Sequence, residues 1–303
     1  MKRLGVLLGG ISNEREISLK SGKQIIKHLD RKKYQIRAYD PKTQLMRFIK
    51  DAKSGRIDIV FNALHGKGGE DGSIQGVLDW LNIPYTGSGV LASALTMDKE
   101  KTKAMYRQNG IPTPPSIIVE SVDLKRIKSK LGKQIVIKPN MDGSSVGVSV
   151  NPPYSQWKKL IESRIKAEGS CLLESFRAGR ELTVGILGSQ ALPVIEIRPK
   201  TAFFDFEAKY IAGMCEEICP APIPKKITLE AQALALKAHK ILGCRGYSRT
   251  DMIWGKKGIE VLETNTLPGM TETSLLPLAA RTAGITYPKL LDHMIRLAGN
   301  NSL

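Results

Sequence analysis

The order of elements at the N-terminus constrains the fold most. Residues 3–8 form an apolar run that predicts a buried strand, and Gly9-Gly10 ends it in a tight turn. A helix is expected to begin near Asn13, because Asn13 and Glu16 have the spacing of a capping box. Two further strands, with a helical stretch between them, are expected over 34–40 and 57–64. This order predicts a parallel α/β unit.

The rest of the chain continues to alternate between helical and strand-like patterns. Strands are expected over 116–120, 134–138, 148–150, 171–176, 180–187, 191–197, 247–254 and 259–264. Helices are expected over 90–108, 155–167, 228–242, 274–283 and 287–298, and a basic helix is expected between the strands 116–120 and 134–138. Residues 203–224 have no clear period and are expected to form a long loop, of the kind that often acts as a lid. A length of 303 residues fits two or three compact units, and the pattern favours three, over 1–96, 97–176 and 177–303.

Composition excludes several classes of protein. No apolar run is long enough for a membrane span, and the short run before Gly9-Gly10 is no signal peptide, so we expect a cytoplasmic protein. Four cysteines without paired metal-ligand spacing are expected to be reduced thiols. The formal charge of +17 allows nucleic-acid binding, but the basic residues are scattered and lack interleaved aromatic residues. A solvated basic surface that attracts anionic substrates is the favoured interpretation.

The strongest chemical pattern is a predicted hairpin near the C-terminus. The strands 247–254 and 259–264 are joined by Gly255-Lys-Lys-Gly258, a turn-like sequence. Residues two apart on a strand share a face, so Arg249 and Asp251 should point together, as should Glu263 and Asn265. Paired across the turn, these four side chains would lie on one face. Their oxygen atoms suit Mg²⁺, although spacing alone also allows a surface salt bridge between Arg249 and Asp251.

Two other segments could bind anions. After the second strand of the hairpin, Pro268-Gly269 predicts a turn and Ser274-Leu275 opens a helix, whose free N–H groups could bind a carboxylate or serve only as an ordinary capped start. The Gly/Ser stretch 140–147 follows an apolar strand that ends at Lys138. It lacks the order of a Walker A loop, and it fits a phosphate-binding loop and a plain hairpin turn about equally.

Taken together, these segments resemble the D-alanine–D-alanine ligase family of the ATP-grasp superfamily. The similarity extends over nearly the whole chain and is most specific in segments 7–18, 64–72, 85–89, 97–99, 143–147, 207–210 and 265–274. The resemblance implies an α/β, Rossmann-like parallel-sheet domain at the N-terminus, followed by a two-part α+β ATP-grasp fold. It also implies that D-alanine is activated by ATP as an acyl phosphate and joined to a second D-alanine, as a step of peptidoglycan precursor synthesis.

The resemblance implies roles for residues that patterns alone do not assign. Glu14 would hold the ammonium of the first D-alanine beside His65, and Glu14, Ser144 and Tyr210 would form a cluster that closes the lid. Arg249 and the Gly269 N–H would stabilise the acyl phosphate and the oxyanion. Ser274 and the Leu275 N–H would bind the second carboxylate, with Lys209 near the γ-phosphate. The implied ATP contacts are Lys99, Lys138, Ser145, Glu174 and Glu181, and the implied ligands of two Mg²⁺ ions, or of Mn²⁺, are Asp251, Glu263 and Asn265.

Each of these residues also has an ordinary interpretation when it is taken singly. Glu14 could be a first-turn acid favoured by the helix dipole, and Lys99 a solvated helix lysine. Only the joint pattern overturns these interpretations. The alternatives that remain are another ATP-grasp dipeptide ligase or a D-alanyl-D-lactate ligase and, from a different class, a nucleic-acid-binding protein. Tyr210 favours an amine as second substrate, because depsipeptide-forming relatives tend to carry Phe there. A homodimer is what the family suggests.

Overall fold

The N-terminal part is built on a parallel sheet, as the element order predicted. The structure, a computed structural model, describes residues 1–141, 147–199 and 215–299. The sheet has the order β2-β1-β3, with parallel pairing throughout. Its strands are β1 (Lys2–Leu7), β2 (Tyr34–Tyr39) and β3 (Ile59–Asn62), and the helices that follow them are α1 (Arg15–His28), α2 (Pro41–Lys53) and α3 (Ser73–Trp80).

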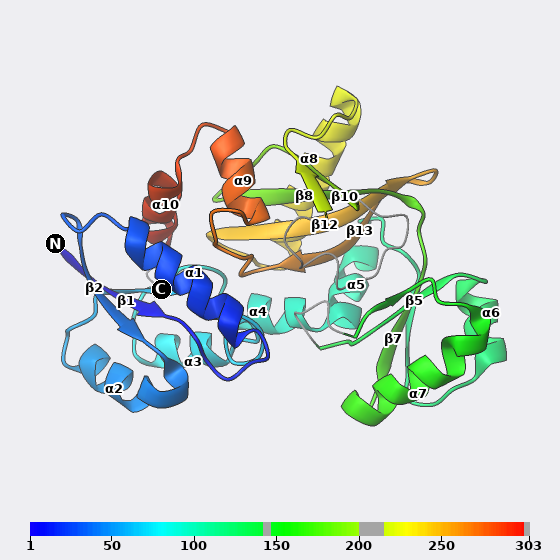
Figure 1. Ribbon diagram of the computed structural model, residues 1–303, viewed down its shortest axis with the longest axis horizontal. Helices are drawn as coiled ribbons and strands as arrows, with labels where there is room; N and C mark the ends of the chain where they lie inside the picture. Colours follow the sequence, from blue (N-terminus) through cyan, green and yellow to red (C-terminus); the bar gives the residue numbers. More distant parts are fainter. Residues whose placement is uncertain (142–146, 200–214, 300–303) are drawn as a thin grey trace.

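Both faces of this sheet are buried, which is why its strands read as apolar runs. Leu4 and Val6 of β1 belong to a core shared with α1 and with the last helix of the chain, α10 (Tyr287–Gly299). Leu7 points to the other face and packs in the core that includes residues of α2 and α3. Figure 1 shows α1 and α10 on one side of the blue strands and α2 and α3 on the other. The C-terminal helix thus completes the N-terminal core.

The helix α1 starts near the predicted position, but the predicted capping box of Asn13 and Glu16 is wrong. The helix begins at Arg15, with Glu14 as its N-cap, and no side chain caps it. Ser12 holds the chain there instead: its hydroxyl accepts from the Glu14 N–H at 3.1 Å and donates to the His65 carbonyl at 2.6 Å. A contact with a distant segment therefore fixes the entry to the helix, in place of the local box expected at Asn13.

The single helix predicted over 90–108 is two helices, α4 (Val90–Met97) and α5 (Lys99–Gln108). Asp98 separates them with an extended backbone, and its side chain accepts from the Lys101 N–H at 3.0 Å as the N-cap of α5. Asp is among the residues preferred at this position. The break places Lys99 at the first position of a new helix.

The central sheet is antiparallel, with the order β4-β7-β5-β6. Its strands are β4 (Ser116–Val119), β5 (Ile135–Lys138), β6 (Ser149–Val150) and β7 (Cys171–Ser175). The helices α6 (Leu124–Leu131) and α7 (Trp157–Glu168) pack against it and complete its core. A short 3₁₀ turn at Tyr154–Gln156 precedes α7. Ile135, Ile137 and Leu173 point into that core. Because side chains alternate along a strand, Lys138 and Glu174 lie on the opposite face.

The third sheet carries the predicted hairpin. It has the order β11-β10-β8-β12-β13, and β9 pairs with β8. Its strands are β8 (Gly179–Leu187), β9 (Gln190–Ala191), β10 (Ile195–Pro199), β11 (Cys215–Ile218), β12 (Tyr247–Gly255) and β13 (Gly258–Asn265). The helix α8 (Lys225–Ile241) shares a core with β8, β12 and β13. In Figure 1 this sheet lies between the N-terminal part and the central sheet.

Two predictions in this region, one of a strand and one of a loop, are wrong. The strand expected over 191–197 is split into β9 and β10. The loop expected over 203–224 contains β11, which pairs antiparallel with β10, and residues 203–214 lie outside the described part of the chain. Cys-Glu-Glu-Ile has no alternating pattern, so only its partner strand makes it recognisable. Within the described residues, no helix is both long and apolar enough to cross a membrane.

Candidate active site

The hairpin of β12 and β13 gathers the four predicted side chains on one face. Gly255 pairs with Gly258 across the turn, and further along Asp251 lies opposite Glu263 and Arg249 opposite Asn265. Residues directly opposite one another in an antiparallel pair point to the same side. The geometric prediction made from spacing is therefore confirmed.

A β-bulge makes this arrangement possible. Ile259, Val261 and Glu263 are two apart and would share one face of a regular strand. The register shifts between Asp251 and Met252, so that Met252 lies opposite Val261. Ile259 and Val261 are consequently buried in the core beneath the sheet, while Glu263 stays beside Asp251. An extra residue that re-aims side chains is a common device next to active sites.

Arg249 and Asp251 form an ion pair. Nε and one terminal nitrogen of Arg249 donate to the two carboxylate oxygens of Asp251 at 3.0 and 2.9 Å, a bidentate pair. The Thr183 hydroxyl on β8 donates to Asp251 Oδ1 at 2.6 Å. Asp251 is buried, and these contacts fix its orientation. The salt bridge that spacing allowed is thus present, and it orients the Arg249 guanidinium across the same face as Glu263.

The donor set at this face fits Mg²⁺. Asp251 and Glu263 supply carboxylate oxygens, and Asn265 supplies an amide oxygen, which also accepts from the Leu267 N–H at 2.8 Å. Zinc sites use His and Cys side chains, and neither is among these three donors. Two carboxylates and an amide suit a hard ion that keeps water and takes phosphate oxygens. Among the described residues there is no group of three or more His, Cys, Asp and Glu side chains with metal-ligand geometry.

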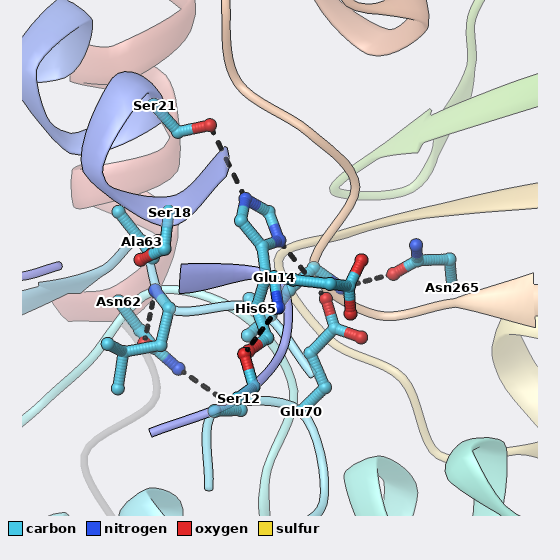
Figure 2. A network of polar contacts seen from close by, with 12 residues as sticks. Ser12, Glu14, Ser18, Ser21, Asn62, Ala63, His65, Glu70 and Asn265 are labelled. Carbon is cyan, nitrogen blue, oxygen red and sulfur yellow. Dashed lines mark hydrogen bonds and ion pairs between the residues drawn. The ribbon is translucent and has the colours of Figure 1, made fainter. Parts of the chain in front are cut away.

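A buried polar cluster lies on the N-terminal side of the site (Figure 2). The two ring nitrogens of His65 lie 3.2 Å from Glu70 Oε1 and 3.4 Å from the Ser21 hydroxyl. His65 and Glu70 are both buried. Glu14 reaches the same region: a Cβ added at Gly66, whose φ is +64°, would lie 2.7 Å from a Glu14 carboxylate oxygen. Glycine at position 66 therefore permits the close approach of Glu14 and the His65 segment.

A hollow connects this cluster with the hairpin. It opens between α4, α5 and the end of β13. Its walls are formed by Glu70, Thr96, Met97, Lys99, Glu263, Thr264, Asn265 and Thr266. Lys99, Glu263 and Asn265, predicted for ATP and metal binding, are thus brought together. Glu70 was not singled out by the sequence, although it stands in the same glycine-rich segment as His65.

Two further predicted residues meet on the central sheet. Lys138 Nζ lies 2.9 Å from Glu174 Oε2, and Lys103 Nζ of α5 lies 2.9 Å from the same oxygen. Burial acts to raise the pKa of Glu174, but Lys103 and Lys138 outweigh it and hold that pKa below its usual value. The sequence did not single out Lys103. Lys103 follows Lys99 by four residues, so the two lysines share one face of a helix, and this spacing could have indicated that Lys103 also faces the site.

Asn140 fastens the start of α5 to the end of β5. Its side-chain amide donates to Asp98 Oδ1 at 3.0 Å and accepts from the Glu100 N–H at 3.0 Å. Its carbonyl accepts from the Lys99 N–H at 3.1 Å. Lys138 precedes Asn140 by two residues, so this clamp sets the position of one predicted phosphate-binding lysine relative to the other. Sequence reasoning missed Asn140, because its partners are some 40 positions away in the chain.

The segment after β13 leads into α9 (Leu275–Thr282), close to the predicted helix. Ser274 is the N-cap, but its side chain does not cap the helix. Its hydroxyl accepts from the Thr271 N–H at 3.1 Å and lies 2.7 Å from the Thr271 hydroxyl. A Cβ on Gly269 would lie 3.0 Å from the Ser274 hydroxyl, so the turn and the helix start are close together. The Leu275 N–H belongs to the first turn of α9, where such groups bind anions.

The remaining predicted residues are either apart from these groups or outside the described residues. Glu181 lies on β8, opposite Ile253 of β12 and Ile197 of β10. Because Asp251 and Ile253 are two apart, Glu181 shares the face of the sheet that carries Asp251. Predictions at Ser144, Ser145, Lys209 and Tyr210 fall outside the described part of the chain.

The protein has a parallel sheet covered on both faces, followed by two antiparallel sheets. Lysines and carboxylates of these two sheets lie near α5. This is the architecture of an ATP-grasp ligase. Two family models match the chain: D-ala D-ala ligase N-terminus over residues 37–88 and D-ala D-ala ligase C-terminus over residues 105–296. The chain therefore belongs to the D-alanine–D-alanine ligase family.

Individual relatives agree with this assignment. The chain is 47% identical to the D-alanine–D-alanine ligase of Syntrophobacter fumaroxidans, with 97% of each chain covered. It is 45% identical to the enzyme of the same description from Erythrobacter litoralis, covering 97% of this chain and 92% of that one. The solved structure of D-alanine–D-alanine ligase from Bacillus anthracis complexed with ATP has a TM-score of 0.88 at 35% identity, covering 100% of this chain and 99% of that one.

Proposed function

We propose that this protein joins two molecules of D-alanine into D-alanyl-D-alanine through an acyl phosphate, with release of ADP and phosphate. The observation that carries the proposal is the register of β12 and β13, which places Arg249, Asp251, Glu263 and Asn265 on one face in a chain of this family. The product would enter peptidoglycan precursor synthesis. A ligase of D-lactate or of other amino acids is not favoured, since the relatives described above are D-alanine–D-alanine ligases.

At the hairpin, Asp251, Glu263 and Asn265 would hold Mg²⁺, with Mn²⁺ as a substitute. The bound ions would neutralise phosphate charge during transfer. Arg249 would stabilise the acyl phosphate, and the Gly269 N–H would stabilise the oxyanion of the second step. The bidentate contact with Asp251 supports this role, because it holds the guanidinium in one orientation before substrate binds.

Two sites for D-alanine would lie on either side of this face. Glu14 would bind the ammonium of the first molecule, with His65 beside it. The burial of His65 and its contacts with Glu70 and Ser21 support a fixed orientation of the imidazole. Ser274 and the Leu275 N–H would bind the carboxylate of the second molecule at the start of α9. Roles for Ser144, Lys209 and Tyr210 rest on the sequence resemblance alone.

ATP would lie between the central sheet and the hairpin. Lys99 and Lys138 would contact its phosphates, together with Ser145 of the Gly/Ser loop. Glu174 would lie on the adenine side of ATP, and Glu181 on the ribose side. The clamp at Asn140 supports a joint role for the two lysines. Unit boundaries at 96/97 and 176/177, a homodimer and a cytoplasmic location belong to the same proposal. The first boundary is supported by the break between α4 and α5, and the second by the end of β7 at Ser175.

A substrate panel tests the proposal. The purified protein is incubated with ATP, Mg²⁺ and either D-alanine, L-alanine or D-alanine plus D-lactate, and both released phosphate and the condensed product are measured. D-alanyl-D-alanine with one phosphate released per dipeptide is the expected result. Absence of this dipeptide, with product formed only from L-amino acids or D-lactate, would overturn it. Tight, steeply salt-dependent binding to DNA or RNA without ligase turnover would favour the nucleic-acid alternative.

A further inference from the structure

Lys103 is a charged side chain in a completely enclosed position. It lies on α5, and its side chain is 0% exposed. Its ammonium contacts Glu174 Oε2 at 2.9 Å and donates to the Thr113 hydroxyl at 2.6 Å. Burial of an ammonium group is expensive unless it is paired. Burial lowers the pKa of Lys103 to about 8, although Glu174 opposes the shift. Because burial of this ammonium is unfavourable, we expect its charge to have a role in the site.

The same carboxylate oxygen receives a second lysine with a different environment. Lys138 Nζ also lies 2.9 Å from Glu174 Oε2, but it sits at the end of β5 and keeps 9% of its side chain exposed. Lys138 is followed by the clamp residue Asn140, next to the segment proposed to bind phosphate. Enclosure limits Lys103 to Glu174 and Thr113, whereas Lys138 can reach a ligand.

We infer that Lys103 is a positioning residue that serves as the permanent counter-ion of Glu174, so that Lys138 can transfer from Glu174 to the phosphates of ATP. Without Lys103, withdrawal of Lys138 would leave a buried carboxylate with no cation beside it, which is strongly unfavourable. Lys138 would then stay on Glu174 and contribute less to nucleotide binding. This inference rests on the proposed role of Lys138 at ATP.

The test measures binding of a non-hydrolysable ATP analogue with Mg²⁺ by calorimetry, together with the KM for ATP and for D-alanine. Lys103→Met keeps the length and removes the charge. We expect the Kd of the analogue and the KM for ATP to rise at least ten-fold, while the KM for D-alanine stays within two-fold. Lys158→Met is the control, because Lys158 lies on α7, pairs with Glu162 and has a side chain that is 68% exposed; it should bind the analogue like the wild type.

The double variant Lys103→Met/Glu174→Gln separates positioning from a purely structural role. It removes the buried carboxylate that would retain Lys138, and it leaves one fewer buried charge pair, so it should fold even if the single variant does not. It is compared with Glu174→Gln alone, so that any contact of Glu174 with the adenine is absent from both proteins. We expect the two to bind the analogue within two-fold of one another, because Lys103 acts through Glu174. Wild-type affinity in a folded Lys103→Met, or a further ten-fold loss when Lys103→Met is added to Glu174→Gln, would overturn the inference. Because the binding measurement requires no dipeptide synthesis, it remains informative even if the substrate panel contradicts the proposed function.

Discussion

The clamp at Asn140 allows a quantitative prediction. Asn140→Ala removes two side-chain hydrogen bonds, one to the Asp98 carboxylate and one from the Glu100 N–H, and leaves the backbone bond from Lys99. A bond to a charged group contributes about 1.5–3 kcal/mol and a neutral one about 0.5–1.5 kcal/mol. The two bonds together contribute about 2–4.5 kcal/mol. We expect part of it to appear as lost stability and part as weaker ATP binding, because α5 carries Lys99.

The assay is calorimetric binding of the ATP analogue beside thermal unfolding. The Kd should rise about ten-fold, which corresponds to about 1.4 kcal/mol. Asn109→Ala is the control, because Asn109 donates to the Met105 carbonyl at 2.9 Å at the opposite end of α5. It should lose about 1 kcal/mol of stability and keep its affinity. If Asn140→Ala also kept wild-type affinity and lost only stability, the clamp would not position Lys99.

Asn140→Asp, which introduces a negative charge beside Asp98, should have a larger effect than Asn140→Ala. Burial acts to raise the pKa of Asp98, but hydrogen bonds from Lys101 and Asn140 outweigh it and hold that pKa below its usual value, so the carboxylate is ionised at neutral pH. In Asn140→Asp, a second carboxylate would replace the donor that now lies 3.0 Å from Asp98 Oδ1. Like charges repel at this distance, so Asn140→Asp should be less stable and bind the analogue more weakly than Asn140→Ala.

The remaining predictions concern the metal face, the second substrate and acid stability. Glu263→Gln should lower turnover by more than about 100-fold and weaken Mg·ATP binding, because even partners that only orient metal ligands are worth about 10–100-fold; wild-type turnover would falsify the metal assignment. Tyr210→Phe should shift the preference for the second substrate from D-alanine towards D-lactate, as scored by product ratio, and unchanged selectivity would remove Tyr210 as the discriminator. Burial lowers the pKa of His239 to about 4, from 6.5 in the unfolded chain. The stability that neutral His239 contributes, about 3 kcal/mol at most, should therefore be complete above pH 6.5 and be lost as the pH falls towards 4. His239→Gln should flatten this dependence in chemical denaturation, and an unchanged slope would contradict the assignment.

Local sequence patterns determined much of this protein. The apolar run before Gly9-Gly10 and its following helix were enough to predict the parallel unit, because a doubly buried strand and a glycine turn are properties of neighbouring residues. The hairpin of β12 and β13 was predicted in the same way, from the spacing on each strand and the Gly255–Gly258 turn. Alternation also placed Arg249 on the same face as Asp251, and Glu263 on the same face as Asn265, within each strand.

Tertiary structure decided what depends on contacts between distant segments. Spacing along β13 placed Val261 and Glu263 on the same face, and only the bulge, set by burial of Val261 against the core below, separates them. The start of α1 is fixed by Ser12 and the His65 carbonyl rather than by a local cap. Lys103, Lys138 and Glu174 come from one helix and two strands, and meet only because α5 packs against the central sheet. Sequence periodicity determines which way a side chain points, whereas packing determines which partner it meets there.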